Sequence, residues 1–376
     1  MYIKKMELTN FRNYVKQEIE LGSNINILYG NNAQGKTNIL EAIYLSAIGK
    51  SYRTVKDKEL INKDKEFSKV EVEFAKKDRE GKIAVNLSDK KIISVNDIKL
   101  KRMSEALGNI NIVLFSPEEI TIFKEGPDKR RRMLDIIISQ LRPAYVFNLN
   151  NYMEVLKQRN NYLKQIKFEN KPKDMLDVWD MKLAEYAEVI NLYRQEFMKK
   201  IEKKIAPIHN TVTQNKEHIE IKYISNFESK EKFLKKTAES RELDIIKGFT
   251  VHGIHRDDIK LYINGDELGI YGSQGQHRSA ILSIKLSELE IIKEEIEENP
   301  ILLLDDFMSE LDKERREKFL EDIQDNQVII TCTDKLELKN EKKKIFYVEN
   351  RKSKYKKQLV RFIRKKVLDF FRKVII

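Results

Sequence analysis

Two glycine-containing stretches of this sequence have the residue types and spacing that suit phosphate binding. The first, GNNAQGKT at residues 30–37, fits the pattern Gly-x4-Gly-Lys-Ser/Thr between a strand-like run and a helical one. In such a loop backbone N–H groups converge on phosphate oxygens, the lysine reaches the β- and γ-phosphates, and the threonine hydroxyl ligates Mg²⁺. We therefore predict an ATP site with Mg²⁺, formed by Gly30, Asn31, Asn32, Ala33, Gln34, Gly35, Lys36 and Thr37.

A pair of carboxylates supplies the second part of this chemistry. ILLLDD at residues 301–306 is typical of a buried parallel strand, and it ends in Asp305 and Asp306. We expect Asp305 to hold Mg²⁺ together with Thr37, and Asp306 to polarise the attacking water. Lys36 and Asp306 are thus the predicted catalytic residues of an ATPase.

The second glycine-containing stretch is GSQGQHRS at residues 272–279, which precedes a long apolar helical pattern. A helix that begins at Ser273 would present the N–H groups of its first turn, which includes Gly275 and Gln276, to an anion. The competing interpretation is an ordinary helix cap, in which the serine only closes the first turn.

The elements that must position these residues are strands and helices in separate blocks. Strand patterns and one helix fill residues 1–115, and SPEE at 116–119 has the form of a capping box. We predict an α/β fold in which a core with a mixed β-sheet and a phosphate loop is interrupted by a mainly helical insertion. The predicted parts are residues 1–115 and 246–350 for the core, 116–245 for the insertion, and 351–376 for a basic amphipathic tail.

The insertion carries two rows of apolar residues that step by threes and fours on either side of Lys-Pro-Lys at 171–173. This period predicts a short antiparallel helical hairpin, although two ordinary packed helices would give the same pattern. Arg159 interrupts the first row. The rows are Tyr145, Leu149, Tyr152, Leu156, Leu163 and Ile166, then Leu176, Trp179, Leu183, Tyr186, Ile190, Tyr193, Phe197 and Ile201.

The bulk composition is that of a soluble protein with a sizeable core. The chain has 376 residues, 41% of them hydrophobic, and a single cysteine, Cys332, which excludes a disulfide framework and suits a cytoplasmic location. No apolar run reaches the roughly 20 residues of a membrane span. The net charge is +12, but residues 351–376 hold 11 Lys/Arg and one acid, so most of the excess lies in the tail. Nucleic acid is therefore a plausible partner.

The order of these motifs resembles the ATP-binding-cassette ATPases, and among them the chromosome-maintenance branch. The order is phosphate loop, helical insertion, S-x-G-Q at 273–276, a strand ending in Asp-Asp, and SELD at 309–312. The resemblance implies that the helix beginning at Ser273 completes the ATP site of a second copy, so that an ATP-dependent homodimer holds nucleotide between its subunits.

Further motifs resemble the RecF family of DNA replication and repair proteins. They are LTNFRNY at 8–14, GPDKRRRMLD at 126–135 and HRDD at 255–258. This resemblance implies a nucleoid-associated cytoplasmic ATPase that binds single-stranded and duplex DNA at gaps, acts with RecO and RecR, and helps to load RecA in replication, recombinational repair and the SOS response. Arg12 lies in the first motif and is predicted to contact phosphate, of the nucleotide or of DNA; the alternative is a solvated or ion-paired surface arginine.

Several positions depart from the broader cassette pattern. The second carboxylate is Asp306 where most cassettes have glutamate, and Cys332 and Thr333 stand near the usual switch histidine. The region of Glu118 replaces the usual glutamine. We expect slow hydrolysis, because an aspartate reaches less far toward the attacking water.

Other functions fit parts of the pattern. An ATPase subunit of a membrane transporter would leave the helical insertion and HRDD unexplained, and the insertion is too short for a long tethering arm. We expect no integral membrane partner. DNA contacts would be largely independent of sequence, with candidates at KSYRTVKDK (50–58) and in the insertion. The tail carries one apolar helical stripe and would contact DNA, a protein partner or an anionic membrane.

Overall fold

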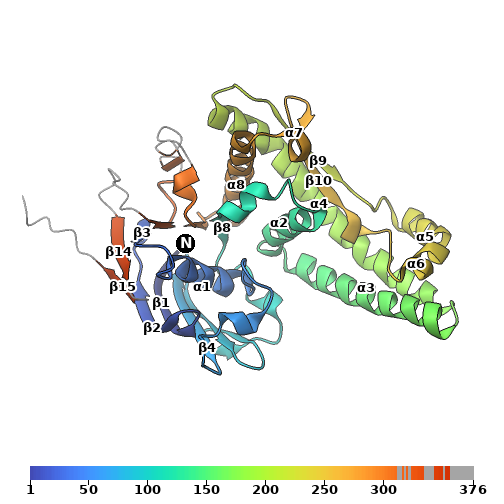
Figure 1. The fold of residues 1–376 in the computed structure, drawn as a ribbon, viewed down its shortest axis with the longest axis horizontal. Helices are drawn as coiled ribbons and strands as arrows, with labels where there is room; N and C mark the ends of the chain where they lie inside the picture. The colour runs from blue at the N-terminus through green and yellow to red at the C-terminus, as the bar shows by residue number, and fades with distance from the viewer. Residues whose placement is uncertain (311–315, 317–318, 321–322, 334–342, 350–351, 356–376) are drawn as a thin grey trace, which may run out of the picture.

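The computed structural model describes residues 1–310, 316, 319–320, 323–333, 343–349 and 352–355 and shows two lobes side by side (Figure 1). The first lobe contains two six-stranded sheets, and the second contains most of the helices and a three-stranded sheet.

One sheet of the first lobe is antiparallel, in the order β2-β1-β4-β5-β6-β7. Its strands show the alternating burial of a sheet with one covered face, as in Ser68–Ala75. The strands are β1 (Tyr2–Phe11), β2 (Tyr14–Glu20), β4 (Ser68–Ala75), β5 (Glu80–Leu87), β6 (Ile92–Val95) and β7 (Ile98–Lys99).

The other sheet has the order β15-β14-β3-β13-β12-β8, and all its neighbours pair in parallel except the edge pair β14–β15. The central strands β3, β13, β12 and β8 read as short, almost continuous apolar runs, as expected for strands covered on both faces. The strands are β3 (Ile25–Tyr29), β8 (Ile112–Phe115), β12 (Ile301–Leu304), β13 (Val328–Cys332), β14 (Lys343–Glu349) and β15 (Lys352–Tyr355).

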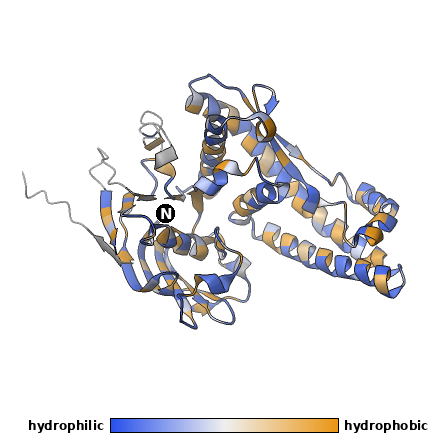
Figure 2. Ribbon diagram, viewed as in Figure 1, coloured by the Kyte–Doolittle hydropathy of each residue, from blue (hydrophilic) through white to orange (hydrophobic). Residues whose placement is uncertain are grey.

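Helix α1 (Lys36–Ile48) begins directly after the phosphate loop and contacts strands of both sheets. Eleven of its residues are buried, and Figure 2 shows it as predominantly hydrophobic. A helix that is apolar all round must lie in a core rather than on a surface. Its N-terminus is therefore held rigidly at the carboxyl end of β3.

The second lobe contains an antiparallel hairpin of α3 (Pro143–Glu169) and α4 (Met175–Thr213), as the apolar rows predicted. Proline at the first position starts α3, and Asn170 ends it with a left-handed φ of 52°. Twenty-seven residues give α3 a length of about 40 Å. Arg159, the polar break in the first row, is fully buried between the helices.

Shorter elements pack along this hairpin. Strand β9 (Ile219–Ile224) pairs with β10 (Asp258–Ile263), which pairs with β11 (Asp266–Glu267). The β9–β10 pair joins residues on either side of position 245, where we placed a boundary between insertion and core. The helices are α2 (Pro127–Ser139), α5 (Lys230–Glu239), α6 (Arg241–Lys247) and α7 (Leu268–Tyr271).

Helix α8 (Gln274–Ile296) links the two lobes. Its residues Ile281 and Ile284 belong to the core of the second lobe, whereas Leu282 and Leu286 pack with β8 and β12 beneath the parallel sheet. The helix is thus buried on two faces along most of its length, and it is exposed in its N-terminal turn and at Glu290, Lys293 and Glu294 near its C-terminal end.

One local prediction was wrong. SPEE forms a 3₁₀-helix, Pro117–Thr121, and the Ser116 side chain makes no capping hydrogen bond. Lys352–Tyr355, at the start of the basic tail, form strand β15 and pair with β14. The apolar stripe at 359–374 lies outside the described residues, as do 311–312 of SELD. Within the described part of the chain, no helix has the length and apolar character needed to cross a membrane.

Candidate functional site

The phosphate loop connects β3 to α1 and requires glycine at both ends. Gly30 has a φ of 151°, and a Cβ there would lie 2.3 Å from the carbonyl oxygen of Val348 in β14. Gly35 has a φ of 111°, and a Cβ there would lie 2.8 Å from the Tyr14 hydroxyl. Side chains are therefore excluded by strain and by contact at both positions. Between them, Asn31, Asn32 and Ala33 are exposed, so the loop opens to solvent.

The lysine of the loop is buried beneath it. Lys36 is 4% exposed, and its Nζ donates to the carbonyl oxygens of Gly30 at 2.6 Å and Asn31 at 3.0 Å. The Tyr14 hydroxyl donates to the carbonyl of Gly35 at 3.1 Å and braces the loop from β2. The Lys36 ammonium group is thus held at the centre of the loop, where it could bind the oxygens of a phosphate.

Asp305 follows β12 and lies beside the first turn of α1, as predicted. Its Oδ1 accepts a hydrogen bond from the Thr37 hydroxyl at 2.9 Å, although the two residues are 268 positions apart. Thr331 donates to the same oxygen at 2.8 Å, and the Tyr52 hydroxyl donates to Oδ2 at 2.9 Å. Three hydroxyl donors therefore fix this carboxylate.

The donors fit Mg²⁺. A threonine hydroxyl and a carboxylate are hard oxygen ligands, and here they touch each other beside the loop. Within the described ranges, no cluster of three or more His, Cys, Asp or Glu side chains could hold a metal by itself. A site with two protein oxygens suits Mg²⁺, which usually takes its other ligands from water and nucleotide phosphates.

Asp306 adopts a left-handed backbone conformation with a φ of 48° directly after Asp305. Partial burial and the neighbouring charge of Asp305 raise the pKa of its carboxyl, while Lys36 opposes this shift. Partial burial and Asp305 likewise raise the pKa of Glu118, which lies in the 3₁₀-helix after β8. Two carboxyl groups with raised pKa values thus flank the predicted metal ligand, an arrangement typical of acid–base sites.

Arg12 lies next to the phosphate loop but points at a buried carboxylate. Its Nε and Nη2 donate to Glu41 of α1 at 2.8 and 2.6 Å, and Glu41 is fully buried. Ser51 and Arg53 also donate to Glu41, at 2.5 and 3.3 Å. This carboxylate was missed from the sequence, although a glutamate inside the apolar run NILEAIYLSAI is a detectable signal. A contact of Arg12 with nucleotide stays a prediction.

The second segment predicted to bind phosphate lies at the start of α8. The Ser273 hydroxyl accepts from the Gln276 N–H, and the Gln276 side chain accepts from the Ser273 N–H, which completes a capping box. Ser273 and Gly275 are exposed. Figure 1 places this turn beside α7 in the second lobe, away from α1 in the first.

Two of the family-like motifs meet in the structure. Arg130 of GPDKRRRMLD makes a bidentate ion pair with Asp258 of HRDD, at 2.7 and 3.0 Å. Arg131 donates to the carbonyl of Asp257 at 2.7 Å, and Arg132 donates to the carbonyl of Ser51 at 3.1 Å. The motifs therefore tie α2 to β10 and to the segment after α1.

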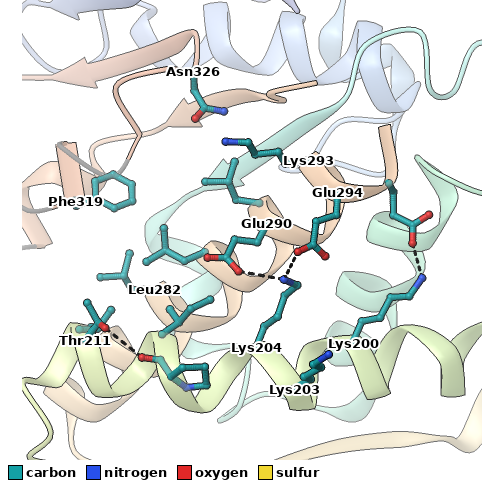
Figure 3. Close-up of a pocket in the computed structure, with 16 residues that line it drawn as sticks. Lys200, Lys203, Lys204, Thr211, Leu282, Glu290, Lys293, Glu294, Phe319 and Asn326 are labelled. Carbon is teal, nitrogen blue, oxygen red and sulfur yellow. Dashed lines mark hydrogen bonds and ion pairs between the residues drawn. The ribbon is translucent and has the colours of Figure 1, made fainter. Parts of the chain in front are cut away.

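A cavity of about 810 Å³ lies between α4 and α8 (Figure 3). Leu282 and other apolar side chains form its floor, and Lys204 pairs with Glu290 and Glu294 across it. No predicted site residue lines this groove, so its size alone does not mark the nucleotide site.

Comparisons with known proteins agree with this geometry. Residues 2–357 match the family model of the RecF/RecN/SMC N terminal domain. The DNA replication and repair protein RecF of Acetivibrio thermocellus is 45% identical over 346 residues, which cover 89% of this chain and 94% of that protein. The RecF protein of Clostridium kluyveri is 48% identical over 339 residues, which cover 89% and 93%.

Solved structures give the same result. The structure of the recombination mediator protein RecF with ATP in the RecFOR pathway matches with a TM-score of 0.90 and 38% identity, covering 95% of this chain and 98% of that one. The Smc head domain of Pyrococcus furiosus matches with a TM-score of 0.54 and 18% identity, over 99% of each chain. The second likeness concerns the fold alone, and together they confirm the predicted α/β ATPase head with a helical arm.

Proposed function

The chain belongs to the RecF family of DNA replication and repair proteins, and from this premise we propose that it is an ATP-dependent DNA-binding switch. In this proposal ATP closes a homodimer on DNA, and slow hydrolysis releases it. The observation that carries it is the joining of Thr37 to Asp305 beside the buried Lys36, because this trio has the layout of a phosphate-binding ATPase site.

The residues of the first lobe would bind ATP and prepare its hydrolysis. Lys36 and the N–H groups of the loop would neutralise the β- and γ-phosphates, and Thr37 with Asp305 would hold Mg²⁺. Bound Mg²⁺ would supply electrophilic stabilisation of the phosphoryl oxygens. Asp306 would accept a hydrogen bond from the attacking water, and its raised pKa makes it a suitable acceptor of the proton.

The exposed turn at the start of α8 supports the dimer. Ser273, Gly275 and Gln276 lie in the second lobe, so the phosphate loop that they would complete is one of another copy. In a two-fold dimer each chain would contribute a loop to one ATP and a helix start to the other. Removal of the γ-phosphate would then break the link between the subunits.

DNA, RecO and RecR are the proposed partners, and loading of RecA in gap repair and the SOS response is the proposed role. A solved relative is described as part of the RecFOR pathway, and this chain shares 38% identity with it over nearly its whole length. We further propose that the protein acts in the cytoplasm at the nucleoid, on single-stranded and duplex DNA. The transporter alternative is dropped, because the relatives reported above are DNA replication and repair proteins.

Sedimentation tests the proposal. The wild type, Lys36→Ala and a control variant at an exposed lysine of β2, Lys16→Ala, are compared with and without ATP and DNA. We expect ATP to shift the wild type and the control to dimer, and DNA to sediment with that dimer. Lys36→Ala should stay monomeric. Equal sedimentation of all three proteins with ATP would contradict the proposal.

A further inference from the structure

Thr331 is a fully buried residue near the carboxyl end of β13, between β12 and β3. The residues before it, Val328, Ile329 and Ile330, are apolar and also fully buried. A hydroxyl in such a strand must be paired, because an unpaired buried polar group costs free energy. The partners of this hydroxyl are both residues of the aspartate pair.

The Thr331 hydroxyl has one hydrogen to donate, and the geometry shows where it goes. Oγ1 lies 2.8 Å from Oδ1 of Asp305 and 3.5 Å from the carbonyl oxygen of Leu304. The shorter contact, to a charged acceptor, takes the hydrogen. The backbone N–H of Asp306 donates to the same Oγ1 at 2.9 Å. A single hydroxyl therefore holds Asp305 by its side chain and Asp306 by its backbone.

The contact with Asp306 matters because of the backbone there. A φ of 48° is unusual for a residue with a side chain, and such a conformation persists only when its surroundings hold it. This backbone conformation determines the direction in which the Asp306 side chain leaves the chain. The contact with Asp305 matters because Thr37 shares the same Oδ1. Thr331 thus fixes the position of Asp305 Oδ1, the oxygen that also accepts the hydrogen bond from Thr37 of α1.

We propose that Thr331 is a positioning residue for both metal binding and hydrolysis, because its hydroxyl sets the orientation of the two aspartates at once. It would act through Asp305 and Asp306, which its hydroxyl contacts. The inference rests on the proposed ATPase function and assigns a role at the strand end where cassette ATPases usually carry a switch histidine.

The experiment compares three variants at this position and one elsewhere. Thr331→Val keeps the shape of the side chain, and Thr331→Ser keeps the hydroxyl. Thr331→Ala differs from the serine variant only by that hydroxyl, so this pair decides the question if the valine variant does not fold. The control is Thr237→Val in α5, where the hydroxyl of a fully buried threonine donates to the carbonyl of Phe233 in its own helix.

The readouts are ATP binding without metal, Mn²⁺ binding in the presence of ATP by electron paramagnetic resonance, and kcat. Loss of an outer partner of a metal ligand typically costs about 10- to 100-fold in metal affinity or activity. We expect losses of this size in Mn²⁺ affinity and kcat for the valine and alanine variants. ATP binding without metal should be unchanged, and Thr331→Ser and Thr237→Val should stay within about threefold of the wild type.

Equal Mn²⁺ affinity and equal kcat for Thr331→Ala and Thr331→Ser would overturn the inference. If both variants match the wild type, the hydroxyl has no role. If both show the same loss, packing and not the hydroxyl is responsible. A wild type that binds no ATP would instead refute the proposed function itself, so the two failures are distinguishable.

Discussion

Replacement of Arg159 by alanine should lower the free energy of unfolding of the helical arm, hairpin α3–α4 with the elements packed on it, far more than an ordinary surface substitution does. The Arg159 guanidinium is fully buried and contacts Asp180 at 2.6 Å and Asp244 at 2.7 Å. Its Nη1 also donates to the Thr250 hydroxyl at 2.8 Å. The variant leaves two carboxylates in the interior without their main cation, and a single broken buried pair costs about 3–5 kcal/mol.

The structure places the expected cost near the lower end of that range. Asp180 keeps a second ion pair with Arg241 at 3.0 Å, and Asp244 keeps a hydrogen bond from the Val251 N–H at 3.0 Å. We therefore expect a loss of about 3 kcal/mol in the free energy of unfolding of the arm. A control, Lys232→Ala, removes an exposed pair with Glu228 and should leave the free energy of unfolding nearly unchanged, because solvent screens an exposed ion pair.

Urea denaturation followed by tryptophan fluorescence measures this directly. Trp179 is the single tryptophan of the chain and packs in the arm between the two apolar clusters there, so its emission reports on arm unfolding. A change below about 1 kcal/mol for Arg159→Ala would refute the reasoning, because it would mean that the two carboxylates are hydrated or protonated at little cost.

Two further predictions concern single positions. Burial lowers the pKa of His255 to about 4 from 6.5, so the unfolded chain binds the proton first and His255 should destabilise the fold as pH falls through this window. The wild-type free energy of unfolding relative to His255→Gln should drop by at most about 1.4 kcal/mol per pH unit between these values, as urea titrations at each pH would show. Gly30→Ala should abolish nucleotide binding in a fluorescent-ATP assay, because its Cβ would collide with the Val348 carbonyl. Gly265→Ala has the same sign of φ but open space, so it should cost only about 1–2 kcal/mol in stability and leave binding intact.

The contacts predicted from the sequence are those that chain topology dictates. Thr37 begins a helix after one parallel strand and Asp305 ends another, and carboxyl ends of parallel strands meet at one edge of a sheet. Their meeting across 268 residues therefore follows from the motifs alone. The arm was likewise predictable, because its apolar rows carry a helical period over two long segments.

The residues that surround the aspartates were not predictable in the same way. Tyr52 lies in a segment with no regular period, and its contact with Asp305 depends on how that segment turns back after α1. Thr331 looks like an ordinary strand residue, and only the β12–β13 register brings its hydroxyl to Asp305. Buried Glu41 gave a compositional signal, but its arginine partners come from loops whose course the sequence does not define.

The helix start at Ser273 forms an ordinary cap, and this cap is compatible with the proposed phosphate contact. The capping box occupies the Ser273 hydroxyl and the Gln276 N–H, both at the exposed end of α8. Gln274 and Gly275 are exposed, and the first N–H groups of a helix, at the positive end of its dipole, have no partner within the helix. A Cβ at position 275 would meet its nearest neighbour, the Ser273 hydroxyl, only at 3.8 Å, so alanine fits the folded monomer.

Gly275→Ala should therefore separate folding from assembly. Alanine is a better helix former than glycine by up to about 1 kcal/mol, so the monomer should be as stable as the wild type or slightly more so. The added methyl group would stand between the helix start and a phosphate offered by another copy, and Gly275→Leu would enlarge the obstacle. ATP-dependent dimerisation measured by sedimentation should fall in the order Gly, Ala, Leu, while ATP binding by the monomer stays constant. Unchanged dimerisation of the leucine variant would show that this turn is a cap and nothing more.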